Sequence, residues 1–328
     1  MKKNKNKVIL VIFLMAVVFF LGFYSLYNKE SKETEISVVY IPKIQDATND
    51  FWTTLIAGAE MAAKEYNVSL KIVSPASETD TQGQNDLIEK AVQMNPDVLM
   101  ISPISYTDST ELIKKVEKKY HIPVVLVDSY VSENIKASLV ASDNSKLGEV
   151  MGQYACNFVN PESKIAIVSH VPNSSTAIER EQGFCNGLGK EASKIVETVY
   201  SYSNFDTAYE VTKDLLKNHP DITLIAGLNE YSAVGAGRAI KELGLAGNIC
   251  VIGVDNSIAS IRLMEEGILS AIVIQKPFNM GYLSVVTAYK TAKGIQVDRY
   301  IDSGSELITQ TNMYTDNGQK ALFSFLNN

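Results

Sequence analysis

Short apolar runs that end in polar or aromatic side chains recur along this chain and alternate with segments of helical spacing. Six of these runs occupy residues 38–41, 124–127, 164–168, 224–228, 250–254 and 271–274. An apolar run of this length, bounded by polar residues, is typical of a buried strand. Strands that alternate with helices form parallel sheets, and such sheets bind ligands at the carboxyl ends of their strands. The side chains that follow these runs are therefore expected to meet in one crevice.

The alternation falls into two series, each long enough for a sheet of its own. Strands are expected at 36–41, 69–73, 98–101, 123–127 and 138–142 in the first series, and at 164–168, 197–200, 223–227, 250–254 and 270–274 in the second. Apolar residues between them recur at helical spacing, as Leu55, Ala59 and Ala62 do. The roughly 300 residues after the amino terminus exceed a usual single hydrophobic core. The sequence therefore predicts an α/β fold with two doubly wound parallel-sheet lobes.

The amino terminus has the features of a membrane anchor. Lysines within residues 2–7 precede an apolar stretch over 8–27, which is long enough to cross a bilayer. Such lysines stay on the cytoplasmic side, so the rest of the chain is expected outside the cytoplasm. A cleaved signal has a shorter apolar region and a small-x-small site, for which 22–25 is the best match. We predict a single-pass anchor in the cell membrane, with 1–35 forming a cytoplasmic tip, the span and a charged stalk; a removed signal is the alternative.

The charge balance argues against nucleic acid as a partner. The formal net charge is −7 at pH 7, and phosphate binding needs clustered basic residues, which do not follow the amino terminus. The cysteines, Cys156, Cys185 and Cys250, are far apart and lack metal spacing, so they are expected to be buried as small hydrophobic residues. No disulfide, metal or cofactor is expected.

The histidines argue against an enzyme. His121, His170 and His219 have neither metal spacing nor an obvious nucleophile partner. His170 follows an expected strand of the second series, so its side chain could line the crevice. We therefore expect a binding protein without catalytic residues.

The side chains near the expected strand ends suit a sugar. A pyranose has apolar C–H faces, which aromatic rings cover, and a rim of hydroxyls, which charged groups bind more strongly than neutral ones. Phe51 and Trp52 are adjacent in a helix and cannot share one face, so one of them is expected at the crevice. Asp128 and Asp255 suit the hydroxyls, with helix N-caps as the alternative role. Arg180 suits them too, with a surface pair to a neighbouring glutamate as its alternative.

Seven short motifs occur in the order found in a known family. They are Asn49-Asp50-Phe51-Trp52, Val127-Asp128-Ser129, Ala141-Ser142-Asp143-Asn144, Arg180-Glu181-Gln182-Gly183-Phe184, Leu228-Asn229-Glu230, Gly253-Val254-Asp255 and Ile274-Gln275. With these motifs, the chain from 36 to about 307 resembles the type I periplasmic sugar-binding proteins, the group of the ribose-, galactose- and xylose-binding proteins. Each motif is weak alone, and their shared order makes the resemblance specific.

The resemblance implies two lobes that close on a sugar about three crossovers. These are expected near Ser142, near Gln275 and at 307–311. The first lobe would then comprise 36–142 plus 276–308, and the second lobe 143–275 plus 309–328. The implied ligand contacts are Asn49, Phe51, Trp52, Asp128, Ser142, Arg180, Phe205, Asn229, Asp255 and Gln275.

The chain also departs from the ribose-binding pattern. Ser129 stands where ribose-like members carry a second arginine, and Glu230 replaces an aspartate. Losing the arginine removes a bidentate hydrogen-bonding group, which argues against ribose itself. Lys43 is the nearest replacement and joins the expected ligand contacts; a solvated loop lysine is the alternative interpretation.

Two functions fit these expectations. The first is an extracytoplasmic receptor for a monosaccharide, a pentose such as D-xylose, that closes on the sugar and signals to the extracellular domain of a membrane sensor histidine kinase. The second is the solute-binding subunit of an ABC sugar importer, with a permease as its partner. The expected anchor favours the sensor of a two-component system, because importer receptors usually diffuse or carry a lipid tether, and no cysteine precedes Cys156.

Overall fold

One parallel sheet forms the centre of the first lobe. In the computed structural model, which describes residues 15, 35–133, 135 and 137–323, this six-stranded sheet has the order β11-β5-β4-β3-β1-β2, and its strand pairs are parallel. Its strands are β1 (Ile36–Ile41), β2 (Val68–Ile72), β3 (Val98–Ile101), β4 (Val124–Val127), β5 (Ser138–Ala141) and β11 (Tyr300–Asp302). The helices of this lobe are α2 (Asp50–Glu65), α3 (Thr81–Gln93), α4 (Thr110–Lys119) and α10 (Pro277–Ala292).

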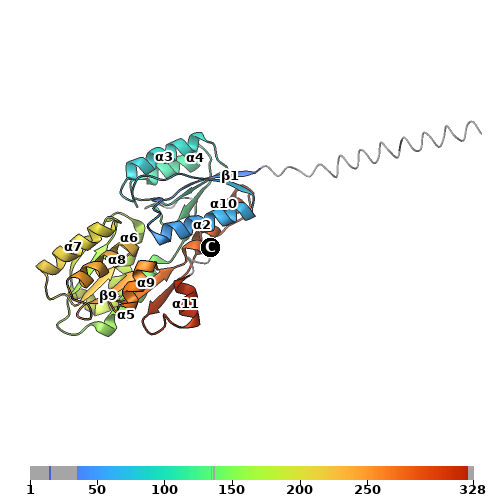
Figure 1. The fold of residues 1–328 in the computed structure, drawn as a ribbon. Helices are drawn as coiled ribbons and strands as arrows, with labels where there is room; N and C mark the ends of the chain where they lie inside the picture. Colours follow the sequence, from blue (N-terminus) through green and yellow to red (C-terminus); the bar gives the residue numbers. More distant parts are fainter. Residues whose placement is uncertain (1–14, 16–34, 134, 136, 324–328) are drawn as a thin grey trace, which may run out of the picture. The chain divides into compact units, whose positions relative to one another are not determined.

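Alternate side chains of β1 enter two separate hydrophobic layers. Val38 and Tyr40 pack with α2 and α10, whereas Val39 and Ile41 pack with α3 and α4. Successive side chains of a strand point to opposite faces, so a run that is apolar throughout is buried on both. Figure 1 shows α3 and α4 on one side of the sheet and α2 and α10 on the other. The expected doubly wound arrangement is confirmed for this lobe.

The second lobe repeats this plan around a second six-stranded sheet, with the order β12-β10-β9-β8-β6-β7. Only β12 runs antiparallel, beside β10. The strands are β6 (Ile165–Ser169), β7 (Ile195–Tyr200), β8 (Leu224–Gly227), β9 (Cys250–Val254), β10 (Leu269–Gln275) and β12 (Ser305–Thr309). Two helices, α5 (Asn144–Ala155) and α6 (Ser175–Leu188), pack on one face. The other face is covered by α7 (Phe205–Asn218), α8 (Glu230–Glu242), α9 (Ile258–Glu265) and α11 (Asp316–Leu322). Short 3-10 turns follow α5 at Cys156–Phe158 and α6 at Gly189–Lys194.

Glycines allow α5 and α6 to approach each other closely beside Arg180. A Cβ atom on Gly148 would collide with the carbonyl oxygen of Arg180, and one on Gly183 would collide with that of Ser145. Both contacts therefore need a residue without a side chain. They hold the first half of α6, which carries Arg180, against α5.

The chain passes between the lobes at three places. The first passage joins β5 to α5 at Ser142, the second joins β10 to α10 at Lys276, and the third joins β11 to β12 at Ser303 and Gly304. The hydroxyl oxygens of Ser142 and Ser303 are 3.1 Å apart, so the first and third passages touch. Gly304 has a φ of +90°, a conformation that other residues adopt only with strain.

The third passage comes earlier than the expected position at 307–311. Ser305–Thr309 forms β12 and pairs with β10, so these residues belong to the second sheet. Their side chains alternate between its faces, because Ile308 joins the layer of α7 and α8 while Leu307 packs on the layer of α5 and α6. The expected crossover at 307–311 is therefore wrong, because pairing with an open sheet edge holds this segment on the second lobe.

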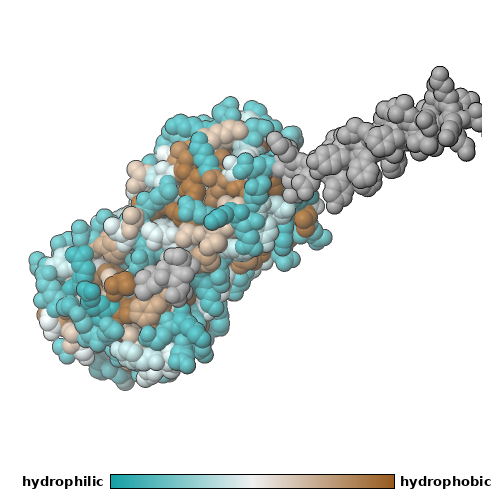
Figure 2. All heavy atoms as spheres, turned by 45° about the vertical axis from the view of Figure 1, so that its right-hand side comes forward, coloured by the Kyte–Doolittle hydropathy of each residue, from teal (hydrophilic) through white to brown (hydrophobic). Residues whose placement is uncertain are grey.

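The expected anchor at 8–27 lies outside the described residues, apart from Met15. The chain divides into Met1–Glu35 and Ile36–Asn328, and the second unit contains both lobes. Among the described residues, no helix is both long enough and apolar enough to span a membrane. Hydrophilic side chains cover most of the face of the second unit seen in Figure 2, with hydrophobic side chains in patches between them.

The cysteines differ in part from expectation. Cys156 is exposed, whereas Cys185 and Cys250 are half-buried, and all three are free. Cys156 lies in the 3-10 turn after α5, where the chain leaves the hydrophobic layer. The expectation of three buried cysteines was wrong for Cys156 and is met only in part by Cys185 and Cys250.

Candidate functional site

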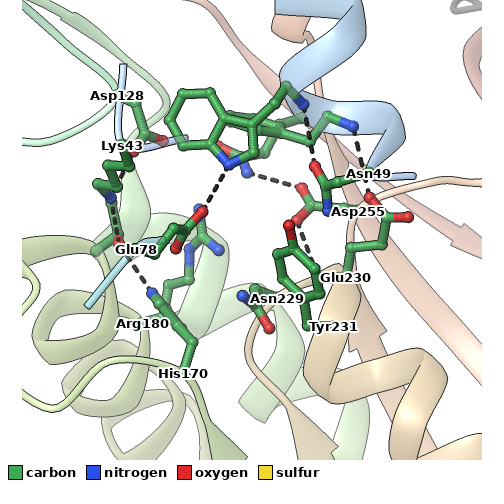
Figure 3. A pocket seen from close by; sticks show the side chains of 14 residues that line it. Lys43, Asn49, Glu78, Asp128, His170, Arg180, Asn229, Glu230, Tyr231 and Asp255 are labelled. Carbon is green, nitrogen blue, oxygen red and sulfur yellow. Dashed lines mark hydrogen bonds and ion pairs between the residues drawn. The ribbon is translucent and has the colours of Figure 1, made fainter. Parts of the chain in front are cut away.

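A cavity lies between the lobes at the carboxyl ends of their strands (Figure 3). The space between its lining side chains, including the part that is open to solvent, amounts to about 320 Å³. The lining residues are Lys43, Asn49, Phe51, Trp52, Glu78, Asp128, His170, Thr176, Arg180, Asn229, Glu230, Tyr231, Asp255 and Gln275. This set contains every expected ligand contact except Ser142 and Phe205.

Two buried aspartates occupy equivalent positions in the two lobes. Asp128 directly follows β4 and Asp255 directly follows β9, with φ angles of +66° and +72°. Each backbone amide still bonds to the neighbouring strand, at Val140 for Asp128 and at Val273 for Asp255. Left-handed backbone is uncommon outside glycine and concentrates at functional sites. Neither aspartate is a helix N-cap, since Ser257 caps α9 and the segment after Asp128 is not helical, so that alternative is wrong.

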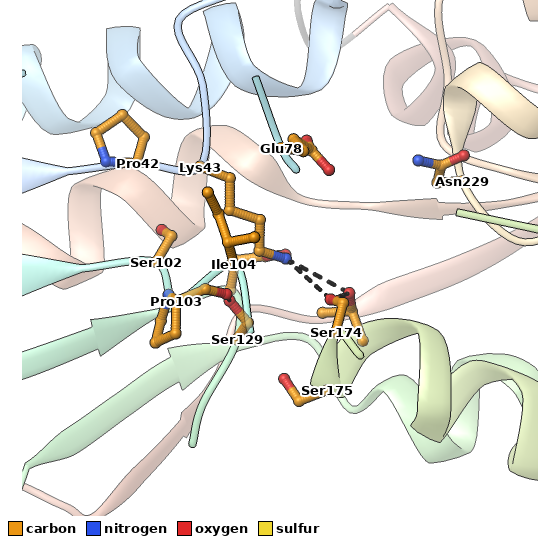
Figure 4. Close-up of polar contacts among 12 residues, drawn as sticks. Pro42, Lys43, Glu78, Ser102, Pro103, Ile104, Ser129, Ser174, Ser175 and Asn229 are labelled. Carbon is orange, nitrogen blue, oxygen red and sulfur yellow. Dashed lines mark hydrogen bonds and ion pairs between the residues drawn. The ribbon is translucent and has the colours of Figure 1, made fainter. Parts of the chain in front are cut away.

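Lys43 pairs with Asp128 inside the cavity. The lysine side chain is 4% exposed, and its Nζ lies 2.8 Å from Asp128 Oδ2. The same Nζ is 3.5 Å from the hydroxyls of Ser174 and Thr176 on the second lobe (Figure 4). Ser129, which stands in the place of an arginine, donates instead to the carbonyl of Pro103 at 2.8 Å. The solvated-lysine alternative is therefore wrong, and a cation lies beside Asp128.

The second lobe contributes a cluster of acceptors. Asp255 accepts hydrogen bonds from Gln275 Nε2 at 2.7 Å and from the backbone amide of Glu230 at 3.2 Å. Burial raises the pKa of Asp255, and the Arg180 charge acts in the opposite direction. Burial and the nearby charges of Asp255 and Asp50 raise the pKa of Glu230 to about 9. Among the described residues, the Oε1 atom of Gln275 has no hydrogen-bond partner, so this oxygen can serve a ligand donor.

Arg180 is fixed by neutral partners rather than by an ion pair. Its Nε donates to Asn144 Oδ1 and its Nη1 donates to the carbonyl of Leu228, both at 2.8 Å. Within the described ranges, no salt bridge includes Arg180, so the surface-pair alternative is not what the structure has. The guanidinium keeps Nη2 for a further acceptor, as a ligand hydroxyl requires.

His170 is buried as a neutral ring in the cavity wall. Its Nε2 lies 2.9 Å from the Thr176 hydroxyl. Burial lowers the pKa of His170 well below its usual value, and the charges of Arg180 and Lys43 add to this effect. Its Nδ1 has no partner in the described part of the chain. The possibility that His170 lines the crevice is confirmed.

Two asparagines begin the helices that point at the cavity. Asn49 caps α2 by accepting from the amide of Trp52 at 3.0 Å, and Asn229 caps α8 by accepting from the amide of Ser232 at 2.9 Å. Their side-chain oxygens are thus used locally. Each NH2 group carries two hydrogens, of which Asn229 already donates one to the Ser203 hydroxyl at 3.3 Å. Phe51 and Trp52 both line the cavity, with rings 5.1 Å apart at an interplanar angle of 85°.

The lobes contact each other on both sides of the cavity. Tyr231 donates to Asp46 Oδ2 at 2.7 Å, and the amide of Ile258 donates to Asp50 Oδ2 at 3.3 Å. On the opposite side, Tyr130 donates to Glu179 Oε1 at 2.7 Å. These bonds join residues of different lobes, so they hold the lobes in a closed arrangement.

Ser142 and Phe205 do not line the cavity. The hydroxyl of Ser142 bonds with Ser303 in the adjacent passage, so Ser142 belongs to the connection between the lobes. Phe205 begins α7 and packs on Tyr231, with ring centroids 4.6 Å apart. Tyr231 therefore stands between Phe205 and the cavity.

Sequence reasoning missed Glu78, Thr176 and Tyr231 as lining residues, and named Glu230 only as a departure from the family pattern. Tyr231 follows β8 within the first turn of α8, and Thr176 lies in the first turn of α6. Glu78 lies in the loop after β2. The rule that ligands meet the carboxyl ends of strands applies to all three residues. It was applied only to the side chains nearest the strand ends, and not to the loops and first helical turns that follow.

Comparison with known proteins agrees with this geometry. Residues 38–296 match the family model described as a periplasmic binding protein domain. The chain is 30% identical over 271 residues to the ribose import binding protein of Bacillus subtilis, which covers 81% of this chain and 86% of that protein. The named relatives are binding and transport proteins, not enzymes.

Solved structures share the fold over most of the chain. A sugar transporter from Clostridium phytofermentans is 40% identical, with a TM-score of 0.79 over 84% of this chain and 99% of that one. A solute-binding protein from Agrobacterium vitis with bound D-fucose is 29% identical, with a TM-score of 0.81 over 87% of this chain and 99% of that one. With its two wound lobes and the cavity between them, the chain belongs to the type I periplasmic sugar-binding protein family.

Proposed function

We propose that this protein binds one monosaccharide in the cavity between its lobes. The observation that carries the proposal is the composition of the cavity wall, which combines carboxylates, amides, an ammonium and a guanidinium with the rings of Phe51, Trp52 and Tyr231. Hydroxyls need donors and acceptors together, and the C–H faces of a sugar need an apolar cover. Relatives named for ribose and solved structures with D-fucose or D-arabinose support the ligand class.

The proposed ligand is a pentose such as D-xylose. Support comes from the positively charged residue beside Asp128. Ser129 stands where ribose-like members carry an arginine, and Lys43 supplies the positive charge instead. An ammonium lacks the planar fork of a guanidinium and cannot bind two vicinal oxygens in the same bidentate way. A ligand that places one hydroxyl near Lys43 and Asp128 is therefore favoured over ribose.

The two lobes are proposed to rotate about the three passages when the sugar binds. The first moving unit would be 36–142 plus 276–302, and the second 143–275 plus the chain from 305 onward. Hydrogen bonds that join the lobes, such as that of Tyr231 with Asp46, would form on closure. A sugar can shift this equilibrium only through its greater affinity for the closed form.

We further propose that residues 8–27 anchor the protein in the cell membrane and that its closed form signals to the extracellular domain of a sensor histidine kinase. The apolar stretch behind a lysine-rich tip supports the anchor. If it is retained, the protein should fractionate with membranes at its full 36.0 kDa and resist extraction by high salt. A shortened soluble form would favour a cleaved signal.

A second candidate is the solute-binding subunit of an ABC importer, which the import role named for the Bacillus subtilis relative supports. The two functions differ in what responds to the closed form. Linkage requires that a partner which binds the sugar-bound form more tightly also tightens sugar binding. A pull-down against membrane proteins encoded nearby, with and without sugar, separates a kinase from a permease. Loss of sugar uptake without altered induction in a deletion strain would contradict the sensor.

The ligand itself is tested by a thermal-shift screen of monosaccharides on the purified protein. A ligand that binds only the folded state raises the melting temperature, by an amount that grows with concentration over Kd. We expect D-xylose to raise it most among D-xylose, D-ribose, D-arabinose and D-fucose. The absence of any shift across neutral monosaccharides at millimolar concentration would contradict the proposed function.

A further inference from the structure

Glu78 makes two short hydrogen bonds to different lobes from inside the cavity wall. Its Oε1 accepts from the indole Nε1 of Trp52 at 2.6 Å, and its Oε2 accepts from the hydroxyl of Ser203 at 2.6 Å. Trp52 and Glu78 belong to the first lobe, whereas Ser203 lies between β7 and α7 of the second. Figure 3 shows the carboxylate of Glu78 next to the indole nitrogen at the edge of the cavity. One carboxylate thus links the orientation of an aromatic ring to the contact between lobes.

The bond to Trp52 restricts the indole. Trp52 is 3% exposed and Glu78 is 7% exposed, and a buried indole N–H requires a partner. Rotating the ring within its site would move Nε1 away from the carboxylate and leave the N–H unsatisfied. Glu78 therefore holds the indole plane that lines the cavity.

The bond to Ser203 depends on a specially shaped turn. Tyr202 and Ser203 both have a φ of +52°, and two consecutive left-handed residues other than glycine are costly. The turn is held by the amide of Tyr202, which donates to the carbonyl of His170 at 3.2 Å. This turn places the Ser203 hydroxyl within hydrogen-bond distance of Glu78, and the same hydroxyl accepts from Asn229 Nδ2 at 3.3 Å.

We propose that Glu78 is a positioning residue of this site, which fixes the plane of the Trp52 indole and, through Ser203, makes that position depend on closure of the lobes. The inference rests on the proposed function in taking the ligand to be a monosaccharide. Opening would carry Ser203 away with the second lobe and leave Glu78 with Trp52 alone. The indole is then most restricted in the closed form, in which it would contact the C–H face of the sugar.

The chain contains one tryptophan, so its intrinsic tryptophan fluorescence reports on Trp52 alone. The test compares Glu78→Ala, Glu78→Gln and Ser203→Ala with the wild type, using acrylamide quenching and calorimetric titration with D-xylose, D-ribose, D-arabinose and D-fucose. Ser77→Ala is the matched control, because Ser77 precedes Glu78, its hydroxyl bonds only to Thr79 in the described chain, and it does not line the cavity.

We expect Glu78→Ala to increase quenching of Trp52 in the empty protein and to weaken sugar binding at least tenfold, because it leaves the buried indole N–H without its acceptor. Ser203→Ala should weaken binding by about tenfold and reduce the protection of Trp52 that sugar confers. Glu78→Gln should recover most of both properties, because its amide oxygen can accept from Trp52 and its NH2 can donate to Ser203.

Two results would overturn the inference. Unchanged quenching and affinity in Glu78→Ala would show that the indole does not depend on Glu78. A Glu78→Gln variant as impaired as Glu78→Ala would show that the charge matters, and not the positioning bonds. If the wild type binds no monosaccharide, the proposed function fails, and the quenching of Glu78→Ala against the empty wild type still decides the role of Glu78.

Discussion

Replacing Glu230 by glutamine should change how the stability of the protein depends on pH. Glu230 is 2% exposed, and burial with the nearby Asp255 and Asp50 charges raises its pKa from 4.5 to about 9. In the unfolded chain the carboxyl is solvated, so between these values the folded protein binds one more proton than the unfolded chain. The contribution is complete below about pH 4.5 and is lost as pH rises towards 9.

The size of the pH dependence follows from the one extra proton that the folded protein binds. Stability should fall by about 1.4 kcal/mol for each pH unit, which is about 4 kcal/mol between pH 5.5 and 8.5. At about 2 °C for each kcal/mol in a chain of this size, the melting temperature moves by about 8 °C. Glutamine cannot ionise and keeps an oxygen to accept from the amide of Phe51, which lies 3.5 Å from Glu230 Oε2. The stability of the Glu230→Gln variant should therefore lack this loss with rising pH.

The assay is calorimetric melting of the full chain, without sugar, for the wild type and Glu230→Gln at pH 5.5, 6.5, 7.5 and 8.5. Other groups titrate in both proteins, so the informative quantity is the difference in melting temperature, which should increase steadily with pH in favour of glutamine. Glu265→Gln, on the exposed surface of α9, is the matched control, because it replaces a glutamate outside the buried surroundings of Asp255. Parallel curves for Glu230→Gln and wild type would refute the reasoning, since they would mean that Glu230 is not buried against Asp255.

Other substitutions test the site and the hinge. Asp128→Ala and Asp255→Ala should each weaken sugar binding by about 2 kcal/mol or more, roughly 30-fold, because sugar hydroxyls lose charged partners; calorimetry that finds wild-type affinity in both would refute the site. Lys43→Met should destabilise the protein by about 3 to 5 kcal/mol in urea unfolding, because it leaves Asp128 buried without its cation. Adding Asp128→Asn to that variant should restore part of the loss, and no recovery would count against the ion pair. Gly304→Val should cost at least about 1 kcal/mol, since valine tolerates the φ of +90° poorly; unchanged stability would mean that the third passage can adopt another backbone path.

The regular part of the molecule could be predicted because local pattern and tertiary structure agree there. Runs such as 38–41 are apolar on both faces, and only a strand between two helical layers buries both. Once the strands are known, the place of Asp128 and Asp255 follows, since each comes directly after a strand. That both aspartates line one cavity follows from the topology of the sheets, and no loop conformation needs to be known.

The irregular parts could not be predicted from the pattern alone. β12 is held by the free edge of β10, which is a tertiary contact with no signal in its own five residues. Glu78 reaches the cavity by a loop after β2, and its partner Ser203 needs the left-handed turn after β7. Phe205 was expected at the ligand because of its place in the family order, yet Tyr231 lies in front of it. The paths of loops, and which side chains of a cavity wall face the ligand, depend on packing that the periodicity of the sequence does not encode.

The most direct test of a monosaccharide site between the lobes is a crystal structure of the protein grown with D-xylose or with the best ligand from the thermal screen. We expect one sugar in the cavity, with its hydroxyls within hydrogen-bond distance of Asp128, Arg180 and Asp255. An aromatic ring of Phe51 or Trp52 should lie against its C–H face. A sugar bound elsewhere on the protein, with this cavity filled by water alone, would contradict it.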